Sequence, residues 1–225
     1  MTNTQSNPRR SQKENKIIDS AEEVFASVGF AKAKMEDVAG KAGVSKGTVY
    51  FYFDTKENLY MAVTYRALQV LNDYLYRTIN DNREKPGIES VLSIVETYIN
   101  FCEKHRLYSE VMLDYMSLNR STRDGRDKSK LTTALIESLY YRRVQDIQNL
   151  PINLIIDEIK RGRKDGSIKN SKRPELLYLI AWACTIGFVK LNVAGGQRQT
   201  LLNVEINHWK EYQMEILRRI LLDEN

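Results

Sequence analysis

The residue types best suited to binding chemistry gather between positions 45 and 56. Residues 45–48 combine two hydroxyls, an ammonium and a glycine at the predicted start of a short helix. The N-terminus of a helix presents free N–H groups and positive partial charge, so this segment favours an anionic group such as a phosphate. Aromatic side chains follow at once in residues 50–53. Basic groups beside aromatic ones predict a surface that contacts nucleic acid.

The sequence offers little for catalysis. Its two histidines are His105 and His208. Cys102 and His105 lie one helical turn apart and provide two metal ligands, where a site needs a third and a fourth. No Ser-His-Asp pattern, phosphate loop or dinucleotide-binding glycine motif is recognisable. We therefore predict no enzyme, no metal and no cofactor.

Cysteine usage indicates a reducing compartment. Two cysteines, Cys102 and Cys184, cannot form a disulfide framework. Cys184 lies in apolar sequence and is predicted to be a buried, inert thiol. A redox sensor that uses both cysteines remains an alternative.

Composition favours an ordinary globular protein built from helices. The 225 residues are 42% hydrophobic and 28% charged, with 11 glycines and four prolines. The start has no apolar signal segment, and the longest uncharged apolar stretch, Leu176–Val189, is shorter than the roughly 20 residues that a membrane span needs. We expect this stretch to be a buried helix and the protein to be soluble and cytoplasmic, with no membrane partner.

Positive charge is unevenly distributed along the chain, whose net charge is +5. Residues 1–16 hold four basic residues and one acidic residue, and a basic tail of this kind suits phosphate contact. A second basic stretch, residues 120–130, and a third, residues 160–164, lie in the middle of the chain. Solvated loops are the alternative interpretation of these stretches.

Apolar residues recur at helical spacing over most of the sequence. A first helix is expected from Ser11, as N-cap, to Gly29, and the tail of residues 1–10 is expected to be disordered. Two short helices and a long one to about Asn82 follow. Pro151 should split a long helical pattern over residues 131–161, and the last two helices cover about 176–193 and 202–220. No strand pattern is found.

The second and third helices fit a helix-turn-helix. Ala39 and Ala42 are small enough for two helices to cross closely. Gly43 supplies the positive φ of a tight turn, and Ser45 is placed to cap the third helix. Such a third helix presents its first residues to base edges in the major groove of DNA.

Residues of roughly 15–65 resemble the TetR/AcrR family of transcriptional repressors. The similarity is carried by Gly29-Phe30, Met35-Glu36-Asp37-Val38-Ala39, Ala42 to Phe53, and Thr55-Lys56-Glu57-Asn58-Leu59. The later stretch Ile159–Ile168 is also similar to a loop of that family. The resemblance implies an all-α homodimer with a DNA-binding domain over residues 11–56 and a ligand-binding and dimerisation domain over residues 57–225.

The resemblance also implies roles for individual residues. Ser45 lies in the DNA-contacting segment, and the residues expected near bases are Lys46, Gly47, Thr48 and Phe51. The residues expected at phosphates are Tyr50, Tyr52 and Lys56. Lys34 stands where the family often has a capping Thr or Ser, and it can neutralise a phosphate although the cap is lost. Tyr50 and Tyr52 could instead be core aromatics, and Phe53 is expected in the core.

Two further sets of residues follow from the implied larger domain. A pocket for a small, mostly hydrophobic ligand is expected among Tyr65, Leu68, Tyr98, Cys102, Met112, Tyr115, Met116, Tyr140 and Trp182. Ordinary core packing is the alternative for each of them. The dimer interface is expected to include Phe188, Trp209 and Ile216.

The leading hypothesis is therefore a repressor that a ligand releases from a pseudopalindromic DNA operator. The alternative is a helical enzyme, or a metal- or redox-responsive protein, in which the N-terminal helices are only structural.

Overall fold

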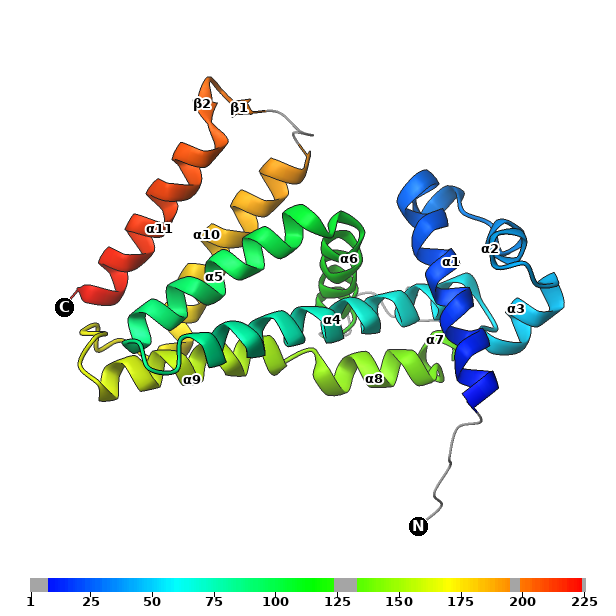
Figure 1. Cartoon of the computed structure of the whole chain (residues 1–225), viewed down its shortest axis with the longest axis horizontal. Helices are drawn as coiled ribbons and strands as arrows, with labels where there is room; N and C mark the ends of the chain where they lie inside the picture. The colour runs from blue at the N-terminus through cyan, green and yellow to red at the C-terminus, as the bar shows by residue number, and fades with distance from the viewer. Residues whose placement is uncertain (1–7, 124–132, 195–198, 224–225) are drawn as a thin grey trace, which may run out of the picture. The chain divides into compact units, whose positions relative to one another are not determined.

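The computed structural model describes residues 8–123, 133–194 and 199–223, and within them the fold is all-α, as predicted. The helices are α1 (Pro8–Lys32), α2 (Met35–Ala42), α3 (Lys46–Tyr52), α4 (Lys56–Asp81), α5 (Gly87–Lys104), α6 (Arg106–Arg123), α7 (Thr133–Ile136), α8 (Leu139–Ile147), α9 (Leu150–Lys164), α10 (Pro174–Ala194) and α11 (Ile206–Leu222) (Figure 1). An antiparallel hairpin of two strands with two residues each, β1 (Thr200–Leu201) and β2 (Val204–Glu205), lies between the last two helices in the sequence. This hairpin is too short to show a strand pattern in the sequence.

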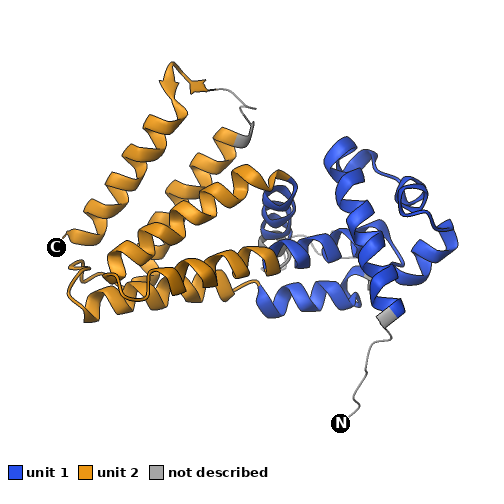
Figure 2. Cartoon of the chain, in the orientation of Figure 1, with its two compact units in different colours: residues 1–68, 107–147 blue, residues 69–106, 148–225 orange. Residues whose placement is uncertain are grey.

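The chain forms two compact units (Figure 2). One comprises Met1–Leu68 and Leu107–Ile147, and the other Gln69–Arg106 and Gln148–Asn225. Helix α4 contributes its first half to one unit and its second half to the other. These units are defined by packing, so the functional boundary expected between residues 56 and 57 stays a prediction.

Helix α1 begins earlier than the sequence suggested. Residues 1–7 of the expected tail lie outside the described residues, but residues 8–10 are helical. Pro8 suits this start, because its fixed φ is preorganised for a first turn in which its missing N–H is not needed. Gly29 (φ 76°, ψ 160°) interrupts the helix near its end, where the sequence predicted a stop.

The helix-turn-helix forms as predicted. Gly43 adopts the left-handed conformation (φ 63°, ψ 38°) that ends α2. Val38, Ala39, Ala42 and Val49 are buried between the helices, the last two with no exposed surface. Helix α2 also packs on α1. The small alanines permit this close crossing, so local residue choice fixes how α3 is presented.

Lys56 ties the end of α1 to the start of α4. Its ammonium donates hydrogen bonds to the carbonyl oxygens of Phe30 (2.7 Å), Ala31 (3.3 Å) and Ala33 (3.0 Å). It also lies 4.5 Å from the centre of the Phe30 ring. These carbonyls have no partner within a helix that has ended, and a lysine beside them satisfies them and opposes the helix dipole.

The second unit is organised around the close crossing of α5 and α9. A Cβ on Gly87 would lie 2.3 Å from the Cα of Gly162, so only glycine fits there. Asp165 accepts a hydrogen bond from the Gly87 N–H (2.7 Å), and Ser167 accepts one from the Ile88 N–H (3.1 Å). The loop after α9 therefore caps α5, which gives a structural reason for the pattern in residues 159–168.

Helix α10 is less buried than the sequence suggested. Its segment Pro174–Asn192 is long and apolar enough to cross a membrane, a test that core helices of soluble proteins also pass. Only 22% of the apolar window is buried within the chain. Leu176, Leu179 and Leu191 are each about half exposed, and Cys184 is exposed, so the expected buried thiol is wrong. One face of α10 packs on the unit, and the other is an uncovered apolar surface.

The cap formed by Lys56 makes a testable prediction about stability. Lys56→Met should lower the free energy of unfolding by about 2 kcal/mol, because three carbonyl oxygens at the end of α1 lose a charged hydrogen-bond donor. Lys32→Met removes the same charge from an exposed position and should cost at most about 0.5 kcal/mol. Urea unfolding followed by circular dichroism measures both, and equal losses would contradict the capping role.

Candidate nucleic-acid interface

The start of α3 is held by a side-chain cap, as the sequence predicted. Ser45 Oγ accepts a hydrogen bond from the Thr48 N–H (3.1 Å) and lies 2.8 Å from Thr48 Oγ1. Ser45, Lys46 and Gly47 are exposed, and Thr48 is half-buried. The cap keeps this turn in a defined geometry while leaving its side chains accessible.

Helix α3 divides its residues between the core and the solvent. Val49 and Phe53, just past the helix end, are buried, as expected of Phe53. Phe51 is 70% exposed and Tyr50 is 39% exposed, while Tyr52 is half-buried with its ring centre 5.3 Å from that of Phe51. The core alternative for Tyr50 is therefore wrong. Tyr50 and Phe51 thus present aromatic surface to solvent on the same short helix as the capped first turn.

Lys46 has a partner within the chain. Its ammonium forms an ion pair with Glu36 on α2 and lies 5.7 Å from the centre of the Tyr50 ring. Their hydrogen bond lowers the pKa of Glu36 and raises the pKa of Lys46. Both side chains are about half exposed, so the pair is weak in water and can be exchanged for another anion.

The two other predicted phosphate ligands differ in their availability. Lys34 is exposed at the N-cap of α2 and makes no side-chain cap, as expected. Its N–H instead donates to Asp37 Oδ2 (3.3 Å). The expectation that Lys56 contacts a phosphate is corrected, because its ammonium already donates hydrogen bonds to the three carbonyl oxygens at the end of α1. Lys34 remains available for an anion and Lys56 does not.

Sequence analysis missed the polar contacts that join α1 to the helices of the same unit. Arg66 on α4 pairs with Asp19 (2.5 Å) and Glu22 (3.1 Å). Tyr108 on α6 donates to Glu22 (3.0 Å). Tyr140 on α8 donates to Glu14 (2.8 Å). These partners are 44 to 126 residues apart, so no local spacing reveals them.

The predicted pocket residues fall into two groups, one in each unit. Leu68, Met112 and Tyr115 are buried in the first unit, where Tyr65 and Tyr140 also lie with ring centres 5.9 Å apart. Met116 belongs to the same unit and is half-buried.

The second group consists of Tyr98, Cys102 and Trp182. Tyr98 and Cys102 are buried on α5, and the Tyr98 ring centre lies 5.3 Å from that of Trp182 on α10. Burial raises the pKa of Tyr98 well above its usual value. The second unit also contains a narrow apolar pocket between α5, α9, α10 and α11, lined by Val95, Ile159, Leu177 and Leu217 among others. None of the predicted pocket residues lines it.

The predicted dimer residues are unequally exposed. Phe188 is fully buried and packs edge-on against Trp209, with ring centres 4.7 Å apart. Phe188 is therefore a core residue between α10 and α11, which corrects its assignment to a dimer interface. Trp209 is half-buried, and Ile216 is 37% exposed on α11.

Comparison with known proteins identifies the N-terminal part of the chain. The profile described as "Bacterial regulatory proteins, tetR family" matches residues 17–63. The transcriptional activator FasR of Mycolicibacterium smegmatis is 33% identical over 97 residues, 42% of each chain. The biofilm operon negative regulator IcaR of Staphylococcus epidermidis is 27% identical over 78 residues, 35% of this chain and 42% of IcaR. The matched part thus spans about two fifths of the length of these relatives.

A solved structure extends the similarity of fold to most of the chain. FadR of Bacillus subtilis, solved with stearoyl-CoA, superposes with a TM-score of 0.60 at 20% identity, over 92% of this chain and 98% of FadR. The matched residues 17–63 contain the helix-turn-helix with its exposed α3 face. Residues 17–63 therefore match the DNA-binding domain of TetR-family transcriptional regulators.

Proposed function

We propose that this chain is a homodimeric transcriptional repressor that a hydrophobic ligand releases from a pseudopalindromic operator in the cytoplasm. The uncovered face of α3 carries this proposal. It presents Lys46, Tyr50 and Phe51 to solvent beside a capped first turn. In a helix-turn-helix, these positions approach base edges and phosphates.

The uncovered surface of α10 and α11 supports a dimer. Helix α10 exposes Leu176, Leu179, Ile180 and Leu191, and α11 exposes Tyr212 and Ile216. A second copy of the chain would bury this surface by the same contacts on both sides of a two-fold axis. A dimer with two α3 helices about 34–36 Å apart reads two half-sites in successive major grooves.

A long acyl chain is the ligand class that we propose. The narrow pocket of the second unit is lined by aliphatic side chains, which offer no partner to a polar group and would have to move apart to admit a hydrocarbon chain. FadR, which has the same fold, was solved with stearoyl-CoA. The proposed ligand is therefore a long-chain acyl-CoA whose acyl part enters the second unit.

Release from DNA requires that the ligand favours one arrangement of the DNA-binding helices. Helix α4 contributes to both units and begins at Lys56, beside α1. Arg66, further along α4, holds the carboxylates of α1. We propose that a ligand-induced shift of α4 moves α1, and α2 and α3 with it.

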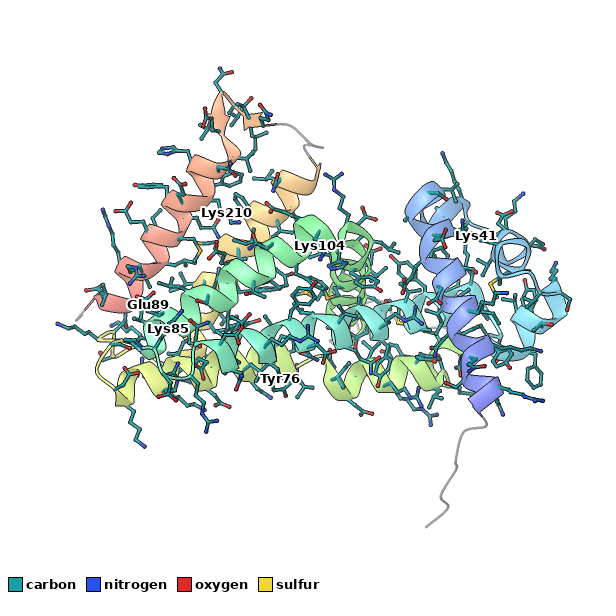
Figure 3. All side chains as sticks on the ribbon, viewed as in Figure 1. Lys41, Tyr76, Lys85, Glu89, Lys104 and Lys210 are labelled. Carbon is teal, nitrogen blue, oxygen red and sulfur yellow. The ribbon has the colours of Figure 1, made fainter. Side chains whose placement is uncertain are left out.

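The proposed DNA contact predicts a loss of both affinity and sequence preference in Lys46→Ala. Duplexes recovered from random DNA by selection with the wild-type protein serve as the probe. Lys46→Ala should weaken binding to them by about 1–3 kcal/mol for each half-site, the range for a bidentate base contact, and lose less on unselected DNA. Lys41→Ala (labelled in Figure 3) is the control, because Lys41 is likewise paired, with Glu23 (2.5 Å), but lies on α2 and not on α3. Wild-type affinity in Lys46→Ala would contradict the assignment of α3.

The proposed dimer predicts that one exposed leucine matters and another does not. Leu179→Glu should convert the dimer to a monomer in sedimentation velocity, because each copy would bury a charge at the interface. Leu139→Glu on α8 changes an equally exposed leucine, 57% against 55%, and should leave the dimer intact. A dimer that persists in Leu179→Glu would exclude the α10 surface.

The proposed ligand predicts reciprocal coupling between stearoyl-CoA and DNA. Stearoyl-CoA should lower affinity for the selected duplex at least tenfold, and the duplex should lower affinity for stearoyl-CoA by the same factor. Val95→Trp, which fills the proposed pocket, should raise the stearoyl-CoA concentration needed for release at least tenfold and leave ligand-free DNA binding unchanged. Tyr76→Trp, at an exposed position of α4 (Figure 3), is the control. Tight stearoyl-CoA binding with unchanged DNA affinity would contradict the coupling.

A further inference from the structure

The first turns of α1 carry a row of basic side chains that make no ion pair with the described residues. We call Arg10, Lys13 and Lys16 the cationic edge. All three are exposed. Helical geometry places them within about a third of the circumference of α1, because each step of three residues turns the helix by about 300°. Lys41 and Arg66 of the same unit, in contrast, form ion pairs with Glu23 and Asp19.

The carboxylates of α1 are directed elsewhere. Glu14 accepts a hydrogen bond from Tyr140, and Asp19 and Glu22 pair with Arg66. Glu23 pairs with Lys41. The fold thus uses the acids of α1 for contacts within the chain, while Arg10, Lys13 and Lys16 form no ion pair among the described residues.

Two contacts place the cationic edge beside α3. The guanidinium carbon of Arg10 lies 5.8 Å from the centre of the exposed Phe51 ring, at the end of α3. The ammonium of Lys16 lies near the turn before α3, 3.7 Å from where a Cβ on Gly43 would be. The cationic edge therefore runs alongside α3, from the last residues of this helix to the loop that joins α2 to α3.

The placement of charge at the start of α1 is unfavourable for the isolated chain. The first turn contains no acidic residue, although the positive end of the helix dipole favours one. Arg9 and Arg10 stand there instead. A cation at this end opposes the helix dipole, and Arg10 forms no ion pair with the described residues. Such an arrangement is typical of a surface that meets a charged partner.

We infer that the cationic edge binds the DNA backbone beside the base pairs contacted by α3. In this arrangement, Arg10, Lys13 and Lys16 each neutralise one phosphate, and the ring of Phe51 holds Arg10 in place. The inference rests on the proposed function, because it adds backbone contacts to the same DNA surface. Phosphate contacts of this kind fix the register of a protein on a duplex without reading its sequence.

The salt dependence of binding tests the inference. Each phosphate contact contributes about 0.9 to the slope of log K against log salt. The proposed dimer has two cationic edges, so Arg10→Ala/Lys13→Ala/Lys16→Ala should remove six contacts and reduce the slope by about 5.4. By the same relation, each contact contributes about fivefold in affinity at 0.15 M salt, so the loss over six contacts should be roughly 10⁴-fold. This loss should be alike on the selected duplex and on a 30-bp duplex of arbitrary sequence. Alanine favours helix, so α1 should stay folded, which circular dichroism checks.

A control with the same change of charge separates local contact from net charge. Lys85→Ala/Lys164→Ala/Lys172→Ala removes three exposed cations from the second unit, none of them on α10 or α11, and should leave the slope within about 0.5 of wild type. Arg10→Lys keeps the charge and should keep the slope. An unchanged slope in the Arg10, Lys13 and Lys16 variant, with wild type binding DNA, would overturn the cationic edge alone. A wild-type protein that binds neither duplex would overturn the proposed function itself.

Discussion

The hydrogen bonds from Lys56 to the carbonyls that end α1 are the constraint on which the DNA-binding part of the fold depends. Lys56 is the first residue of α4, so one ammonium joins the end of one helix to the start of another. The Phe30 ring packs against Lys56 and against Tyr60, 4.5 Å between ring centres, and closes the joint. Helix α2 packs on α1, and α3 packs on α2. The contacts of Lys56 and Phe30 fix α1 against α4, and the packing of α2 on α1 and of α3 on α2 then fixes the direction of α3.

Helix α1 directs its acidic side chains into contacts within its unit, and these contacts bear on the proposed regulation. Its acids contact Arg66, Tyr108 and Tyr140, which belong to α4, α6 and α8. Burial raises the pKa of both tyrosines, so each remains a hydrogen-bond donor to its carboxylate near neutral pH. A movement of any of these three helices must either carry α1 with it or break a contact to a partly buried carboxylate. In the proposed mechanism, ligand response and DNA binding would therefore share helix α1.

Local signals predicted the helix-turn-helix well. Gly43 and Ser45 act on neighbours within three residues, and their roles are confirmed. Interactions over long sequence separations could not be predicted. The lysine at position 56 looks like a phosphate ligand until the carbonyls 23 to 26 residues earlier are seen around it. Phe188 looks like an interface residue because α10 is apolar all round, and only the position of Trp209 shows which side is covered.

Two features of the isolated chain are unfavourable on their own: an exposed Phe51 and an exposed apolar surface on α10. A seven-residue recognition helix reaches few base pairs, so one copy would discriminate poorly between sequences. Joining two copies through α10 and α11 doubles the base contacts and fixes the spacing of the half-sites. The apolar surface and the aromatic recognition helix would then serve one purpose, since the first supplies the pairing that makes the second specific.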